Sequence, residues 1–133
     1  MKINFLHFIL LYAFAVTPSS SWGEQDDYSS CGSGTQLELG MCAEENYKAA
    51  DKELNRLYVE MMKQSEAEGK KNLKESQKAW LNYRDKACAY EGGLFDGGSG
   101  WALAYYGCKA HFTEERNAIL RRYLGCLSKD CPQ

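Results

Sequence analysis

The chain has 133 residues, with 16 Lys and Arg against 18 Asp and Glu, and a formal net charge of −2. This mild acidity argues against a nucleic-acid partner and against a polybasic membrane contact, because both need a strongly basic surface.

The first 23 residues have the pattern of a signal peptide. Lys2 supplies a positive start, residues 5–16 are apolar, and residues 18–23 include small side chains suited to cleavage. The apolar run is shorter than the roughly 20 residues that span a bilayer. We therefore predict a cleaved leader at 1–23, an exported domain at 24–133 in the periplasm or secreted, and no stable membrane insertion. Loss of Lys2 leaves 15 basic and 18 acidic residues, or −3.

All six cysteines follow this leader. An even number of cysteines in an exported chain predicts disulfides rather than free thiols. The six are Cys31, Cys42, Cys88, Cys108, Cys126 and Cys131.

Three helices are predicted in chain order. The first begins at Thr35, which forms a capping box with Glu38, and its apolar residues recur at helical spacing for about 30 residues, with Gly69 as the stop. In the second helix, residues from Leu73 to Cys88 recur at helical spacing along one face, and the helix ends at residues 92–93. The third has Ser99 as its N-cap, runs over 101–124 and ends at Gly125.

No segment alternates as a strand does, so the expected fold is all-α: a disulfide-stapled antiparallel three-helix bundle with a long first helix. Antiparallel packing brings the start of the first helix, the end of the second and the start of the third to one end. Cys31, Cys42, Cys88 and Cys108 belong there and allow three connectivities. Cys126 and Cys131 are expected to close a small loop at the other end.

Polar residues at interior helical positions have two interpretations. They form either a paired polar seam inside the bundle or a binding site, and we favour the seam because polar groups inside a small core must be paired. The residues are Asp51, Asn55, Tyr58, Gln77, Trp80 and Arg84.

The glycine-rich segment 91–101 also has two interpretations. It is either a connector whose apolar residues cover the end of the core or a recognition loop for a protein partner. In the second case the contact residues are Glu91, Phe95, Asp96 and Trp101.

Enzymatic chemistry is not predicted. His111 is the one histidine after the leader, and Cys108-x2-His111 lacks the further ligands that zinc needs. One histidine without a free thiol does not supply a nucleophile and its base. We expect no catalytic residue, no metal and no cofactor.

Several motifs carry a resemblance to a known family. They are Thr35-Gln36-x-Glu38-x3-Cys42, Ala50-Asp51-x2-Leu54-Asn55-x2-Tyr58, Gln77-x2-Trp80-x3-Arg84-Asp85-x2-Cys88, Gly97-Gly98-Ser99, Cys108 and Thr113-x2-Arg116-x3-Leu120. From Cys31 to about Leu124 the chain resembles the lysozyme inhibitor LprI-like family of small exported helical domains. The Cys126–Cys131 tail is an addition to that pattern.

The resemblance implies an exported binding protein whose partner is a lysozyme or a related cell-wall hydrolase. Two other functions stay open at this point. One is an immunity protein that neutralises a toxin delivered into the periplasm, and the other is a structural envelope domain without inhibitory activity.

Overall fold

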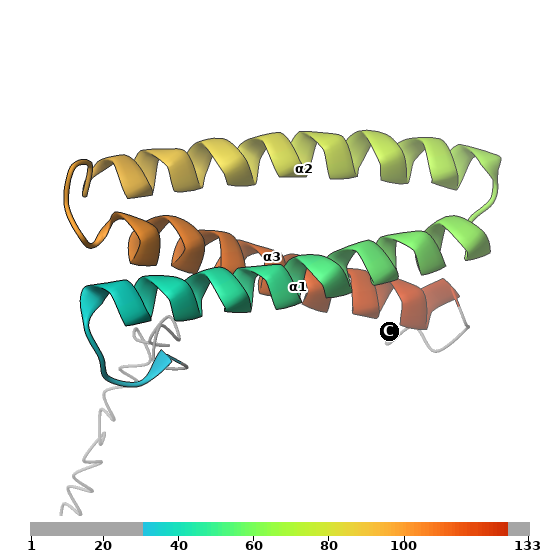
Figure 1. Ribbon diagram of the computed structural model, residues 1–133. Coiled ribbons are helices and arrows are strands. Elements are labelled where there is room, and N and C mark those ends of the chain that lie inside the picture. The colour runs from blue at the N-terminus through green and yellow to red at the C-terminus, as the bar shows by residue number, and fades with distance from the viewer. Residues whose placement is uncertain (1–30, 128–133) are drawn as a thin grey trace, which may run out of the picture.

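The computed structural model describes residues 31–127, which form three helices and no strand (Figure 1). Their bounds are α1, Gln36–Gln64; α2, Ala67–Gly93; and α3, Trp101–Leu127. The helices run antiparallel, so that α1 begins, α2 ends and α3 begins at the same end of the molecule. The predicted all-α bundle with a long first helix is confirmed. The predicted leader lies outside the described residues.

The start of α1 follows from its capping box. The Glu38 N–H donates to the Thr35 hydroxyl at 3.3 Å, and the Thr35 N–H donates to the Glu38 carboxylate at 2.8 Å. At the other end, the N–H and the hydroxyl of Ser65 both donate to the Met61 carbonyl. These bonds end α1 at Gln64, so the prediction that Gly69 ends it is wrong, and Gly69 lies in the first turn of α2.

The start of α3 at Trp101 is as predicted, but its cap residue and its C-terminal limit need correction. The Ala104 N–H donates to the Gly100 carbonyl at 3.0 Å, which puts Gly100 rather than Ser99 at the cap position. The helix continues through Gly125 to Leu127. A glycine weakens a helix by only about 0.5–1 kcal/mol relative to alanine, so a single one does not have to end it.

The helices do not pack equally. α3 packs on both other helices and most extensively on α1, whereas the backbones of α1 and α2 lie farther apart and are joined through side chains such as Asp51 and Arg84. The apolar core lies away from Cys31, Cys42, Cys88 and Cys108 and is built from large side chains of all three helices. Its buried members are Leu54, Leu57, Met61, Leu73 and Leu120.

Two disulfides hold the opposite end, which we call the disulfide end. Cys31 pairs with Cys42 and Cys88 pairs with Cys108. The second bond joins α2 to α3 in the interior, where Cys88 is 0% and Cys108 is 3% exposed. Cys126 is also disulfide-bonded. Because Cys131 lies outside the described residues, the predicted C-terminal loop stays a prediction.

Small residues let α1 approach α3 closely near this end. A Cβ atom added at Gly40 would lie 2.9 Å from the Cβ of Ala102, whereas one added at Gly125 would meet nothing within 4 Å. We expect Gly40→Ala to lower the free energy of unfolding by about 1–3 kcal/mol, since the helices must separate. Gly125→Ala is the matched control and should raise it by about 0.5–1 kcal/mol. Chemical denaturation measures the free energy of unfolding of both variants. The same change in both would contradict the close approach of α1 to α3 at Gly40.

The two disulfides should differ in their contribution to stability. Replacing Cys88 and Cys108 by alanine opens a loop of 20 residues and should lower the free energy of unfolding by at least about 3 kcal/mol, because it also removes two buried sulfurs. The same change at Cys31 and Cys42 opens a loop of 11 residues whose sulfurs belong to half-buried residues, so the loss should be smaller. Urea unfolding of both variants tests this order, and the reverse order would contradict it.

Candidate functional site

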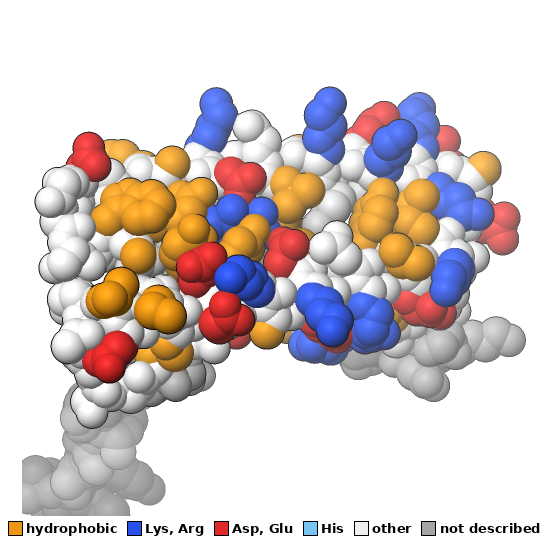
Figure 2. Space-filling view, viewed as in Figure 1, with side chains coloured by type: hydrophobic (Ala, Val, Ile, Leu, Met, Phe, Trp, Pro, Cys, Tyr) orange, Lys and Arg blue, Asp and Glu red, His pale blue; other side chains and the backbone are white. Residues whose placement is uncertain are grey.

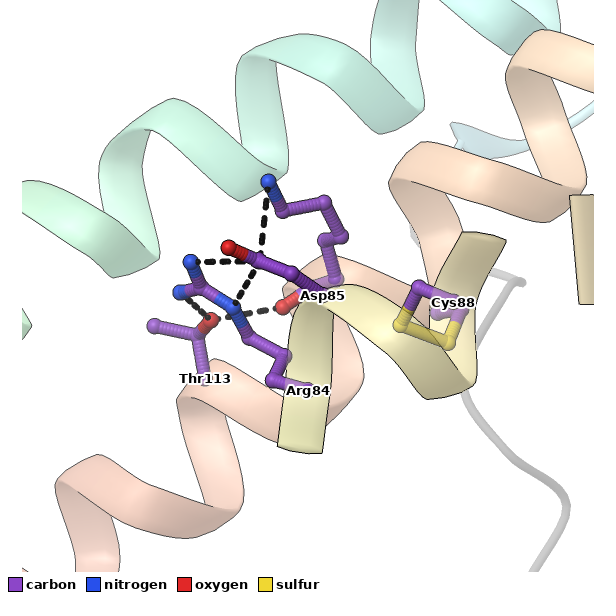
Figure 3. Close-up of a disulfide and its surroundings, with 6 residues drawn as sticks. Arg84, Asp85, Cys88 and Thr113 are labelled. Atoms are coloured by element: carbon purple, nitrogen blue, oxygen red, sulfur yellow. Dashed lines mark hydrogen bonds and ion pairs between the residues drawn. A yellow bond between two sulfur atoms is a disulfide. The ribbon is translucent and has the colours of Figure 1, made fainter. Parts of the chain in front are cut away.

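A charged cluster occupies the middle of the molecule, with Arg84 at its centre. Arg84 is 3% exposed, and its guanidinium contacts side chains from all three helices. Nη1 donates to the Asp51 carboxylate of α1 at 3.2 Å and to the Thr113 hydroxyl of α3 at 3.1 Å, while Nε donates to the Asp85 carboxylate of α2 at 3.0 Å. Figure 3 shows Arg84 and Asp85 projecting from α2 beside Cys88, with Thr113 reaching Arg84 from α3. One buried cation therefore joins the three helices.

A second cation, Lys109 of α3, completes this cluster. Its Nζ lies 3.3 Å from the Asp85 carboxylate and 4.4 Å from the ring centroid of Tyr47. Burial disfavours the charge on Lys109, but a hydrogen bond with Tyr47 and the charge of Asp85 outweigh burial and raise its pKa. Two cations thus face two carboxylates, Asp51 and Asp85, in a cluster whose formal charges balance.

Of the other residues of the expected seam, Asn55 reaches the cluster through Asp51, whereas Gln77 and Tyr58 make separate contacts. The Gln77 carbonyl accepts from Arg116 Nε at 3.1 Å, and burial lowers the pKa of Arg116. Asn55 is exposed and donates to the Asp51 carbonyl and carboxylate on its own helix. Tyr58 packs against the apolar core, and its hydroxyl has no hydrogen-bond partner among residues 31–127.

Trp80 lies beside this seam, but its indole N–H donates no hydrogen bond to the other seam residues. Its ring lies 5.1 Å from the Arg84 guanidinium and 5.7 Å from that of Arg116. The structure therefore brings Asp51, Asn55, Arg84 and Trp80 together, but it does not join all six predicted residues into one network.

Three buried polar residues of α3 were not predicted from the sequence. Lys109, Thr113 and Asn117 are 9%, 0% and 2% exposed. The Asn117 amide donates to the Ala50 carbonyl of α1 at 2.9 Å. Polar residues at successive positions i and i+4 between buried apolar ones are the signal that would have identified this row.

The four predicted partner-binding residues lie at the disulfide end. Phe95 is 50% exposed, and Trp101 is 36% exposed and stacks on Tyr105 with 4.8 Å between ring centroids. Asp96 is exposed and accepts from the Gly97 N–H at 3.0 Å, where Gly97 has a φ of 73°. Glu91 is half-buried in the last turn of α2. The structure thus presents three of the four to solvent.

Further exposed apolar side chains at this end were not predicted from the sequence. Leu37, Met41, Tyr90 and Leu94 are 72%, 60%, 75% and 66% exposed. Figure 2 shows hydrophobic side chains gathered over the end of the molecule where α1 begins. We call this surface the apolar end and define it as Leu37, Met41, Tyr90, Leu94, Phe95 and Trp101. Several exposed apolar side chains on one rigid surface are typical of a protein contact site.

The burial of Arg84 predicts a structural role. Arg84→Ala should lower the free energy of unfolding by about 3 kcal/mol, the low end for a broken buried ion pair, because Asp51 and Asp85 retain solvent contact. Lys86→Ala on the exposed side of α2 is the control and should change it by less than about 0.5 kcal/mol. Thermal and urea unfolding measure both. An Arg84→Ala protein as stable as its parent but unable to bind its partner would overturn this assignment.

Residues 31–127 contain neither a membrane-spanning helix nor a metal site. No helix there is long and apolar enough to cross a membrane. The same residues contain no group of three or more His, Cys, Asp or Glu side chains placed to hold a metal ion.

Comparisons with known proteins indicate the family of this chain. An uncharacterized protein of Rhizobium meliloti (strain 1021) is 33% identical over 103 residues, which cover 68% of this chain and 74% of that protein. No solved structure matches the chain. A family model described as lysozyme inhibitor LprI matches residues 28–120, more than half of the chain and almost all of the helical bundle. The chain belongs to the lysozyme inhibitor LprI family.

Proposed function

We propose that this protein is an exported inhibitor of a lysozyme or a related peptidoglycan-cleaving enzyme, and that the apolar end is its contact surface. The observation that carries the proposal is the apolar end itself, on a chain of a family named for lysozyme inhibition. Binding at this end would block the enzyme's cleft without any chemistry by the inhibitor.

Two features make the apolar end suitable for binding. Aromatic side chains are the commonest anchors of protein interfaces, and Tyr90, Phe95 and Trp101 are all exposed here. The two disulfides and the close contact of Gly92 with Tyr105 restrict its motion, which reduces the entropy lost on binding.

Charge supports the same partner class. The exported chain would carry −3, and Asp96 extends from the loop beside Phe95. Opposite charges accelerate encounter with a basic enzyme and contribute less to the final affinity. Asp96→Asn should therefore slow association more than it speeds dissociation.

Export is part of this proposal. Disulfides such as Cys31–Cys42 and Cys88–Cys108 are typical of proteins outside the cytoplasm. A leader at 1–23 with the pattern described above would deliver the chain to the periplasm or the medium. Intact-mass measurement of protein from its native location tests for cleavage and for oxidised cysteines.

Inhibition is tested with purified exported protein and lysozymes of several types in a cell-wall turbidity assay. Stoichiometric inhibitor should slow turnover of at least one of them. The double variant Phe95→Ala with Trp101→Ala should weaken inhibition by at least roughly tenfold, because it removes two aromatic anchors.

Val59→Ala with Tyr123→Ala provides the control, since both residues are exposed apolar side chains outside the apolar end. This control should inhibit as the parent does, and melting curves should show that both doubles are folded. Full turnover of every lysozyme in the presence of the parent protein would eliminate the proposed function. Equal loss in both doubles would remove the apolar end as the contact surface.

A further inference from the structure

A groove of about 540 Å³ lies between α1 and α2 and is open to solvent. It exists because the backbones of α1 and α2 lie farther from each other than either lies from α3, and their side chains fill the space between them only in part. Its wall on α2 extends from Lys74 to Asp85, about 17 Å at 1.5 Å per residue. This volume falls within the range of small-molecule sites, roughly 300–1,000 Å³.

Gln77 supplies the main evidence that the groove binds a ligand. Its side chain lines the groove and is only 7% exposed. Because its carbonyl oxygen accepts from Arg116, the orientation of the amide is set and its two N–H groups remain. Among residues 31–127 these N–H groups have no acceptor, although solvent still reaches them. Donors held in this way favour a ligand that brings acceptor oxygens.

The rim beside Gln77 adds further donors. Lys74 and Lys78 also line the groove, are exposed and lie one helical turn apart. Neither has a carboxylate within 4.0 Å in the described part of the chain, and like charges at this spacing repel each other. An anionic group between the two ammonium groups would remove that repulsion.

The opposite wall has a different chemistry. Asp51, whose side chain is 33% exposed, and Asn55 present acceptor oxygens from successive turns of α1, beside the ring of Tyr58. These acceptors suit hydroxyl donors, and a tyrosine ring suits the apolar face of a sugar. Among the other charged residues of the lining, Arg84 is paired with Asp51 and Asp85, and Asp85 is also paired with Lys109, which does not line the groove. The net field in the groove therefore comes from Lys74 and Lys78.

We propose that this groove binds an acidic sugar of about disaccharide size. Its carboxylate would lie between Lys74 and Lys78, an adjacent oxygen would accept from Gln77, and its hydroxyls would donate to Asn55 and Asp51. A peptide carboxylate could reach the lysines, but a peptide carries one N–H per residue, whereas every sugar ring carries several hydroxyls for the α1 wall. The inference does not depend on the proposed inhibition, since the groove and the apolar end are different surfaces.

Calorimetry and amide chemical shifts of the purified exported protein test the proposal. The probe is a disaccharide of glucuronic acid and N-acetylglucosamine, compared with neutral diacetylchitobiose and with the dipeptide Asp-Glu. The acidic disaccharide should bind at least roughly tenfold more tightly than either, the contribution of one charge-assisted hydrogen bond or more. Its shifts should centre on residues 55, 58, 74, 77 and 78.

Two variants separate the groups involved. Lys74→Ala with Lys78→Ala should weaken binding by at least roughly tenfold. Lys70→Ala with Lys71→Ala is the matched control, because it makes the same charge change on exposed α2 residues that do not line the groove. Gln77→Glu keeps an oxygen for Arg116 but replaces the N–H donors with a negative charge, so it should abolish binding in a protein that still folds.

Any one of the following results would contradict the proposed sugar site. Equal affinity for the acidic and neutral disaccharides would remove the role of the carboxylate. Equal loss in the two lysine pairs would show a nonspecific charge effect, and unchanged binding by Gln77→Glu would remove the amide contact. Tighter binding of Asp-Glu would indicate a peptide site, and the absence of any shift with the acidic disaccharide would leave no sugar site. The Phe95→Ala and Trp101→Ala double should bind the disaccharide as the parent does.

Discussion

The buried guanidinium of Arg84 is the constraint on which the helix arrangement depends. A cation that is 3% exposed must have partners, and it finds them on every helix: Asp51 on α1, Asp85 on α2 and Thr113 on α3. A one-residue slip of any helix would rotate one of these groups away and leave a buried charge unpaired. The cluster therefore sets the register of the bundle, whereas apolar contacts alone would tolerate several registers.

This polar centre divides the molecule into two different ends. On one side, large side chains such as Leu54, Leu57 and Leu120 form an ordinary apolar core. On the other side, Gly40 and small alanines bring α1 and α3 close, leaving little room for large buried side chains, and the Cys88–Cys108 bond supplies the missing cohesion. Stability at the disulfide end thus comes from covalent bonds, which leaves aromatic residues such as Phe95 and Tyr90 exposed on its surface.

The same arrangement explains why two distinct surfaces are available for binding. Covalent restraint lets apolar side chains face solvent at the apolar end without collapse of the loop. Meanwhile α3 holds α1 and α2 apart, so the groove between them retains donors such as the Gln77 amide and the ammonium groups of Lys74 and Lys78. One surface is apolar and the other is hollow and charged, and each suits a different class of partner.

What the sequence determined by itself was the local structure. The capping box of Thr35 and Glu38, the helical spacing of apolar residues and the even set of cysteines each depend on residues near one another in the chain, so the three helices and the oxidised state could be predicted. Interior positions of Asp51 and Arg84 were visible for the same reason. The limits at Gly69 and Gly125 were predicted wrongly, because glycine propensity is weak beside the hydrogen bonds that Ser65 makes and the packing of α3.

Only the tertiary structure decided the contacts between helices. The choice of Cys31–Cys42 over the other pairings, the approach of Lys109 to Asp85 and the separation of α1 from α2 depend on how each helix is rotated about its axis and on the angle at which it crosses the next. Helical periodicity defines a face of one helix but not its partner on another. The groove in particular is a consequence of the wide spacing between the backbones of α1 and α2, and the sequence of α1 or α2 alone contains no sign of it.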